Sequence, residues 1–160
     1  SAILKQPLAK GPDLCLSDSS FAALAATLQT MLDCCLTYDD HLNASSVLDA
    51  STLFFCEGDQ GQRIFIDSVI RDHSMWSQQL FWEKLMEKSL KKSPEAIDAR
   101  REFIYDWFMN SAHKMLTLGV AFDDVMATVL YLAKVHDLPV SRIDELRRFV
   151  NKVALSMSPD

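Results

Sequence analysis

Glycine and proline are scarce in this chain, whose 160 residues contain four glycines and five prolines. Sandwiches and barrels need many turns, so this scarcity argues against both folds and favours helices. No apolar run reaches the roughly 18 residues expected of a membrane span, and no signal peptide is visible at the N-terminus. Hydrophobic residues make up 49% of the sequence and charged residues 24%, which is typical of a folded globular domain.

Signatures of catalysis and of metal binding are also missing. The sequence contains no C-x-x-C pair, and its four histidines occur singly. The Gly-Asp-Gln-Gly segment at 58–61 has neither the length nor the lysine of a phosphate-binding loop. The aspartate pairs at 39–40 and 123–124 each precede an expected helix, where they favour its N-terminal dipole. We therefore expect a chain that is not an enzyme and that needs no cofactor and no metal.

Four cysteines occur, at positions 15, 34, 35 and 56. Neighbouring residues of a helix point about 100° apart, so Cys34 and Cys35 are poorly placed to share one metal ion. We expect free, mostly buried thiols in a reducing compartment, rather than disulfides or a zinc site. This interpretation favours a cytoplasmic protein.

The net charge of −6 is concentrated in the N-terminal third of the sequence. Residues 1–62 contain eight acidic residues and two lysines, whereas residues 63–160 contain fourteen of each sign. Binding to phosphate backbones requires a basic face, so nucleic acid is not expected as a partner. The acidic third would suit a basic partner surface, or it would serve solubility alone.

Apolar residues recur at helical spacing along most of the chain and predict six or seven helices. Capping oxygens for the first helix are expected from the run Ser17-Asp18-Ser19-Ser20. Ser93 is the expected cap of the helix after the aromatic stretch, and Ser141 with Asp144 resembles a capping box. The expected helical segments are 21–36, from 39 or 40 to 55, 72–92, 94–118, 120–136 and 142–155. The segment 63–72 fits a strand or a helix, and we expect a helix because no second strand is in sight.

These helices predict an all-α fold, either a bundle or a short irregular stack. Residues 1–17 carry Pro7, Gly11 and Pro12 and are expected to form an extended arm. The expected single helical domain covers residues 18–156, and a short tail covers residues 157–160.

The aromatic stretch DHSMWSQQLFWEKLMEKSLKK, residues 72–92, distributes apolar side chains around most of a helix. A helix with so narrow a polar arc is enclosed by neighbours, so these aromatics are expected to pack in the core. Trp76, near the start of the helix, is the one that we expect at the surface.

A cluster of cations is the best candidate surface for a partner, because it spans one helix end and the next helix start. A protein partner or an acidic lipid would suit it, although cations at a helix C-terminus also need no partner. The candidate partner-binding residues are Lys84, Lys88, Lys91, Lys92, Arg100, Arg101 and Trp76.

Three segments of the sequence resemble a helical region shared by regulators of vesicle traffic. The matching residues are Ile64, Ile66, Trp76, Phe81 and Trp82 in the first segment, His113, Met115, Leu116 and Gly119 in the second, and Ile143 and Leu146 in the third. Lys114 departs from the family's usual asparagine. The family includes the C-terminal region of the MAP-kinase-activating death domain protein, a Rab exchange factor, the myotubularin-related SET-binding factors, and small brain proteins that share this module. The resemblance covers roughly residues 60–155, with a looser echo in MLDCCLTYDD, residues 31–40.

The resemblance implies a non-enzymatic helical interaction module in a larger cytosolic protein of vesicle traffic or small-GTPase signalling. It implies a protein partner, such as a small GTPase or a trafficking factor, and membrane association only through the full-length protein. The exchange activity of the named relatives resides in a separate DENN domain and does not transfer to this segment. The alternatives are an RNA- or translation-linked helical scaffold and a structural dimerisation domain.

Overall fold

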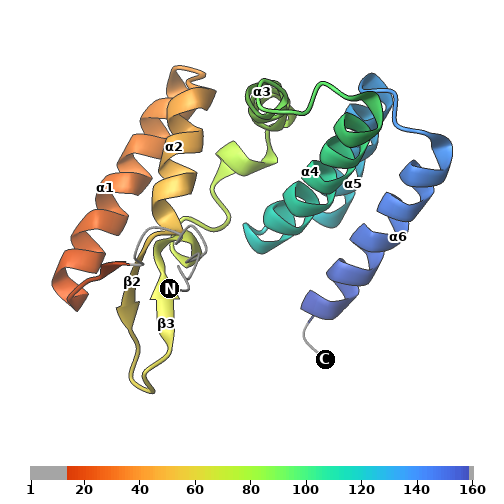
Figure 1. Cartoon of the computed structure of the whole chain (residues 1–160). Coiled ribbons are helices and arrows are strands. Elements are labelled where there is room, and N and C mark those ends of the chain that lie inside the picture. The colour runs from red at the N-terminus through yellow and green to blue at the C-terminus, as the bar shows by residue number, and fades with distance from the viewer. Residues whose placement is uncertain (1–13, 159–160) are drawn as a thin grey trace, which may run out of the picture.

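The computed structural model describes residues 14–158, which form six α-helices and one small sheet (Figure 1). The elements in chain order are β1 Leu14–Cys15, α1 Asp18–Thr37, α2 His41–Ser51, β2 Phe54–Glu57, β3 Arg63–Phe65, the 3-10 turns η1 Ile66–Ser68 and η2 Ser74–Ser77, α3 Gln79–Leu90, α4 Ile97–Thr117, α5 Phe122–Val135 and α6 Val140–Met157. The predicted helical architecture is confirmed, and the sheet is an addition to it.

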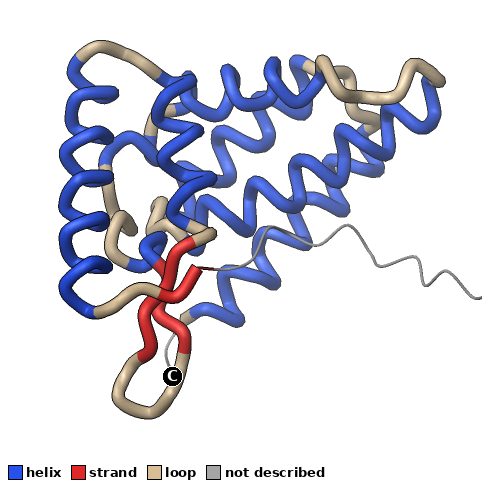
Figure 2. Tube along the Cα trace, turned by 60° about the vertical axis from the view of Figure 1, so that its left-hand side comes forward, coloured by secondary structure: helices blue, strands red, loops and turns tan. Residues whose placement is uncertain are grey.

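The helices form two groups joined by α3 (Figures 1 and 2). Helices α1 and α2 pack together beside the sheet, and α4, α5 and α6 pack against one another on the other side. Helix α3 contacts α2 in the first group and α5 in the second. A single hydrophobic core, which includes Leu32, Phe81, Met86 and Val129, runs through both groups.

The sheet contradicts two expectations. Strands β2 and β3 form an antiparallel hairpin with Phe55 opposite Phe65, so the expected helix over 63–72 is wrong and the second helix ends at Ser51 rather than Phe55. Gly61 adopts a φ of 74° in the connecting turn, a conformation that glycine reaches without strain. The turn brings two short segments together, and neither carries a clear strand signal alone. Strand β1 then pairs in parallel with β2.

The aromatic side chains of this stretch pack in the core, as expected, with their rings edge to face. The stretch is not, however, one continuous helix. Trp76 lies in η2, and α3 begins only at Gln79. The Trp76 side chain is 1% exposed, and its indole N–H donates to the Ile70 carbonyl at 2.8 Å. The expected surface exposure of Trp76 is therefore wrong, because the 3-10 turn directs this ring inward against Phe81, with the ring centroids 5.3 Å apart.

Of the three expected helix caps, only the one at residues 17–20 is confirmed: the hydroxyl of Ser17 accepts a hydrogen bond from the Ser20 amide at 3.3 Å. The hydroxyl of Ser93 donates to the Leu90 carbonyl at 2.7 Å, so Ser93 completes the end of α3, and α4 begins later, at Ile97. Helix α6 begins at Val140, directly after Pro139. Ser141 therefore lies inside the first turn, where it cannot act as the N-cap.

Helix α1 is, by length and composition alone, long and apolar enough to cross a membrane, and 28% of its apolar window is buried in the fold. The sequence expectation was that no apolar run is long enough to span a membrane. It differs because serine, threonine and glutamine residues interrupt the apolar residues of α1, although the helix carries few charges. Helices in the core of a folded domain can have the same length and composition. Most of the expected arm, residues 1–13, lies outside the described residues.

Candidate functional site

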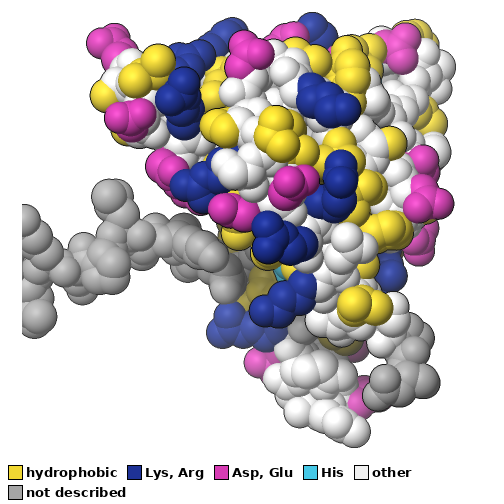
Figure 3. Space-filling model, turned by 90° about the vertical axis from the view of Figure 1, so that its right-hand side faces the viewer, with side chains coloured by type: hydrophobic (Ala, Val, Ile, Leu, Met, Phe, Trp, Pro, Cys, Tyr) yellow, Lys and Arg dark blue, Asp and Glu magenta, His cyan; other side chains and the backbone are white. Residues whose placement is uncertain are grey.

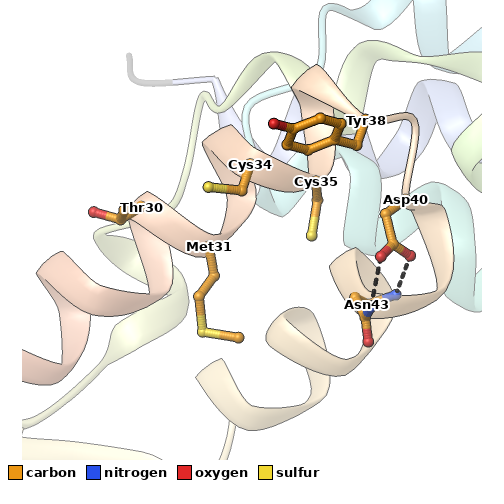
Figure 4. A pocket seen from close by; sticks show the side chains of 7 residues that line it. All are labelled: Thr30, Met31, Cys34, Cys35, Tyr38, Asp40 and Asn43. Atoms are coloured by element: carbon orange, nitrogen blue, oxygen red, sulfur yellow. Dashed lines mark hydrogen bonds between the residues drawn. The ribbon is translucent and has the colours of Figure 1, made fainter.

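A groove of about 380 Å³ opens between the C-terminal half of α1 and the start of α2 (Figure 4). Its walls come from two helices that are adjacent in the chain and joined by a short turn at Asp39, which has a φ of 52°. The lining residues are Thr30, Met31, Cys34, Cys35, Tyr38, Asp40 and Asn43.

The α1 wall of the groove is largely apolar and partly exposed. Met31, Cys34 or Cys35, and Tyr38 recur at the three- and four-residue spacing that puts side chains on one helix face. Met31 is 45% exposed and Tyr38 is 80% exposed, whereas Cys35 is buried. Figure 4 shows that Met31 and Cys35 point into the space between the two helices. Burial, with the nearby Asp40 charge, raises the pKa of the Cys35 thiol, so this wall stays uncharged.

The α2 wall is polar and held in place by hydrogen bonds. One carboxylate oxygen of Asp40 accepts from the Asn43 backbone amide at 3.1 Å, which caps α2, and the other accepts from the Asn43 side chain. These hydrogen bonds lower the pKa of Asp40, so its carboxylate carries its negative charge at neutral pH. The groove therefore combines an apolar side with an anionic end.

The chain segment that forms the groove carries formal charges of one sign. Residues 14–62, which contain α1 and α2, hold seven acidic residues and no lysine or arginine. Helix α1 has no basic residue in its last turn, so no cation of α1 itself offsets the negative end of its dipole. Asp33 accepts a hydrogen bond of 3.0 Å from Nε2 of His73, which ties α1 to η2 while the carboxylate stays 74% exposed.

The structure places the expected basic cluster at the end of α3 and the start of α4 and does not direct its members to one point. Lys84 pairs with Glu87 at 3.1 Å, and Arg101 lies 3.9 Å from Asp98. Lys88 reaches back to the Ser45 hydroxyl on α2, at 3.4 Å.

Other members of the cluster face different neighbours. Arg100 lies close enough to His136, at the end of α5, to lower its pKa. Lys91 and Lys92 are exposed just beyond α3, and the buried Trp76 is remote from solvent.

Acidic residues also offset the cluster. Residues 83–102 contain its six cations and five carboxylates, a net charge of +1. On the face of the α4–α6 group in Figure 3, basic and acidic side chains are intermixed with hydrophobic ones. Partner binding by the cluster remains a prediction, and the groove is the more uniform surface.

The sequence contained part of the signal for the groove. The acidic excess of the first 62 residues is visible in the charge count, and it suits a basic partner or solubility alone. Met31, however, follows the helical spacing of the apolar residues of α1, and α2 leaves it exposed. Tyr38 and Asn43 carried no signal, because the turn that brings them together depends on the left-handed conformation of Asp39.

The described residues hold no group of three or more His, Cys, Asp or Glu side chains able to bind a metal ion. All four cysteines are free, as expected, but only Cys35 and Cys56 are buried, whereas Cys15 and Cys34 are exposed. The expectation that the thiols are mostly buried thus holds for half of them.

Comparison with known proteins gives one match. The family model described as "SBF2: Myotubularin protein" matches residues 7–102. This region contains the groove and the basic cluster. It overlaps the main part of the expected resemblance, placed at residues 60–155, over 60–102, and it includes the looser echo at 31–40. No curated protein and no solved structure matches the chain. Because the match covers more than half of the sequence, the chain belongs to the SBF2 family of myotubularin-related proteins.

Proposed function

We propose that this chain is a non-enzymatic protein-interaction module, and that it receives a segment of its partner in the α1–α2 groove. The observation that carries the proposal is the groove itself, an apolar wall that stays exposed in a folded domain. Concave, mostly apolar sites of a few hundred Å³ are where proteins commonly bind ligands and partner segments. The preformed groove between two packed helices suits an amphipathic segment, which would bury its apolar side there.

Membership of the SBF2 family and the resemblance to trafficking regulators support a cytosolic setting. We propose that the module belongs to a larger protein of vesicle traffic or small-GTPase signalling, that its partner is a protein of that machinery, and that any membrane association comes through the rest of the full-length protein. The free thiols fit a reducing compartment. The acidic α1–α2 layer argues against an RNA-linked scaffold, since phosphate would be repelled by it.

The test is proximity labelling in cells with the intact chain and two variants, one in the groove and one in the basic cluster. Met31→Glu/Tyr38→Glu puts charge on the exposed wall of the groove, and Lys88→Glu/Lys91→Glu reverses two charges of the basic cluster. Both pairs change exposed side chains, so both variants should fold, which circular dichroism and thermal melting would check.

We expect the groove variant to lose the neighbours that the unaltered chain labels, and the cluster variant to keep them. If the cluster variant alone loses them, the basic cluster is the interaction surface and the groove is not. If a folded groove variant labels the same proteins as the unaltered chain, the proposed use of the groove is wrong.

A further inference from the structure

We propose that the occupant of the α1–α2 groove is a cationic amphipathic helix, with apolar residues along one side and lysine or arginine beside them. This inference rests on the proposed function and names the chemistry of the partner. It is carried by two independent properties of the groove, the spacing of its apolar side chains and the sign of the charge around it.

The apolar side chains fix the shape of the occupant. Met31, Cys34 and Tyr38 lie along about two turns of α1, a length of roughly 10 Å. A helix lying alongside them would place residues at positions i, i+3 or i+4, and i+7 against this row. Cys35 forms the buried floor behind the row, and its raised pKa keeps it a neutral thiol. Apolar side chains of the occupant therefore meet no charge on this wall.

The charges at the end of the groove determine which charge the flanking residues of the occupant should carry. Asp39 is exposed and adjoins Asp40 at one end of the groove, where α1 also ends without a basic residue. The negative end of the α1 dipole and the two carboxylates therefore act in the same place. No lysine or arginine of residues 14–62 neutralises them. A lysine or arginine of the occupant near Asp39 would be attracted, and a glutamate there would be repelled.

The same charges disfavour two other occupants. An anionic membrane surface would be repelled by residues 14–62, which hold seven acidic residues and no lysine or arginine. A second copy of the chain would have to present its own basic residues: those on residues 83–102 are offset almost completely by carboxylates, and Arg147, Arg148 and Lys152 on α6 are a small set. A helix with clustered cations fits the groove better than either.

The test uses two synthetic peptides of about 18 residues, the length of roughly five helical turns. Both carry leucine at i, i+3, i+4 and i+7 repeats, and they differ only in having lysine or glutamate at the flanking positions. Binding to the intact chain is measured by fluorescence anisotropy. We expect the lysine peptide to bind at least about tenfold more tightly than the glutamate peptide at low salt, and this preference to shrink as the salt concentration rises.

Asp39→Asn/Asp40→Asn is the variant that tests the charges. Asparagine caps helices about as well as aspartate does, so α2 keeps its N-cap. We expect this variant to bind the lysine peptide about three- to tenfold more weakly. Asp106→Asn/Asp144→Asn, which removes two exposed charges from α4 and α6, is the matched control and should leave the affinity unchanged.

Cys34 reports where the peptide binds. In a Cys15→Ser background Cys34 is the one exposed thiol of the described residues, so a maleimide reagent modifies it first. The lysine peptide should slow this modification in proportion to its occupancy. Protection by vesicles of anionic lipid, or protection that increases with protein concentration and appears without peptide, would instead assign the groove to a membrane or to a second copy and would overturn the inference.

The outcomes separate this inference from the proposed function. If both peptides protect Cys34 equally and the aspartate variant binds normally, the groove is a docking site, but the cationic occupant is wrong. If neither peptide binds and the groove variant still labels its cellular neighbours, both proposals fail.

Discussion

The indole N–H of Trp82 donates a hydrogen bond of 2.8 Å to the backbone carbonyl of Trp76. The two rings are 2% and 1% exposed, and both pack against the ring of Phe81. The bond fixes the start of α3 against η2, the 3-10 turn that precedes it. This pair therefore anchors the helix that joins the two helical groups of the fold.

Trp82→Phe tests the hydrogen bond with most of the packing kept. The Trp76 carbonyl would lose its indole partner, so we expect the free energy of unfolding to fall by about 1–3 kcal/mol. Trp82→Ala would also leave a cavity and should cost about 3–5 kcal/mol, enough to unfold a marginal domain. Urea denaturation monitored by circular dichroism measures both changes. A folded Trp82→Ala variant of unchanged stability would contradict the assignment of Trp82 to the core.

Gly119 is placed where a side chain would meet the carboxylate of Asp72. Its φ of 82° already disfavours other residues, and a Cβ built there clashes with Oδ1 of Asp72. We expect Gly119→Ala to cost about 2 kcal/mol of stability, mostly from the left-handed backbone, with a smaller addition because the exposed carboxylate of Asp72 has to turn aside.

Gly61→Ala is the matched control for that prediction. Gly61 has a similar φ of 74°, but nothing lies within 4 Å of the position of its Cβ. The control should therefore cost only about 1 kcal/mol. Equal losses in the two variants, measured by thermal melting, would show that the contact with Asp72 is unimportant.

Stability should fall in mild acid partly because of His136. Burial, and then the charge of Arg100, lower the pKa of His136 below its ordinary 6.5, although Asp137 and Glu87 oppose the shift. A histidine with a depressed folded-state pKa binds its proton more readily in the unfolded chain. Its stabilising contribution is therefore complete above about pH 6.5 and is lost as the pH falls through the lower folded-state value.

His136→Gln removes this titration. We expect the stability of the variant to change less than that of the unaltered chain between about pH 6.5 and pH 5. Denaturant titrations at several pH values give the comparison. Parallel curves for the two proteins across this range would rule out His136 as the cause.

The thiols should react in two classes. Cys15 and Cys34 are exposed and should be modified rapidly by a maleimide reagent in the native protein. Cys35 and Cys56 are buried, and burial raises the pKa of the Cys35 thiol, so both should react only in denaturant. Mass spectrometry of the labelled chain counts the modified cysteines, and four rapid modifications under native conditions would contradict the burial of Cys35 and Cys56.

Helical periodicity predicted most of the fold because it depends on local spacing. Phe21, Leu28 and Leu32 on α1 are buried as their spacing indicated. The hairpin was missed because the segment 63–72 fits a strand as well as a helix. The partner strand Phe54–Glu57, whose pairing with Arg63–Phe65 decides between them, begins within the residues assigned to the preceding helix. The burial of Trp76 was missed for a related reason, since the switch from helix to 3-10 turn depends on the contacts that Ile70 and Trp82 provide.

The candidate site was less predictable than the fold. The basic cluster stood out because its charges are close in sequence, yet Lys88 and Arg100 face different helices. The groove exists because α2 leaves one side of α1 uncovered. The sequence around Met31 does not indicate which side that is. Only the uneven charge of the N-terminal third carried information about that surface.

Helix α4 extends from Ile97 to Thr117, whereas the region matched by the family model stops at residue 102. A truncation at that boundary would cut the helix near its start and discard Phe108 and Met115, which are 0% and 1% exposed. The apolar side of α3 and the core around it would then face water. A recombinant fragment meant to represent the family therefore has to extend through α6, well beyond the part of the sequence by which the family is recognised.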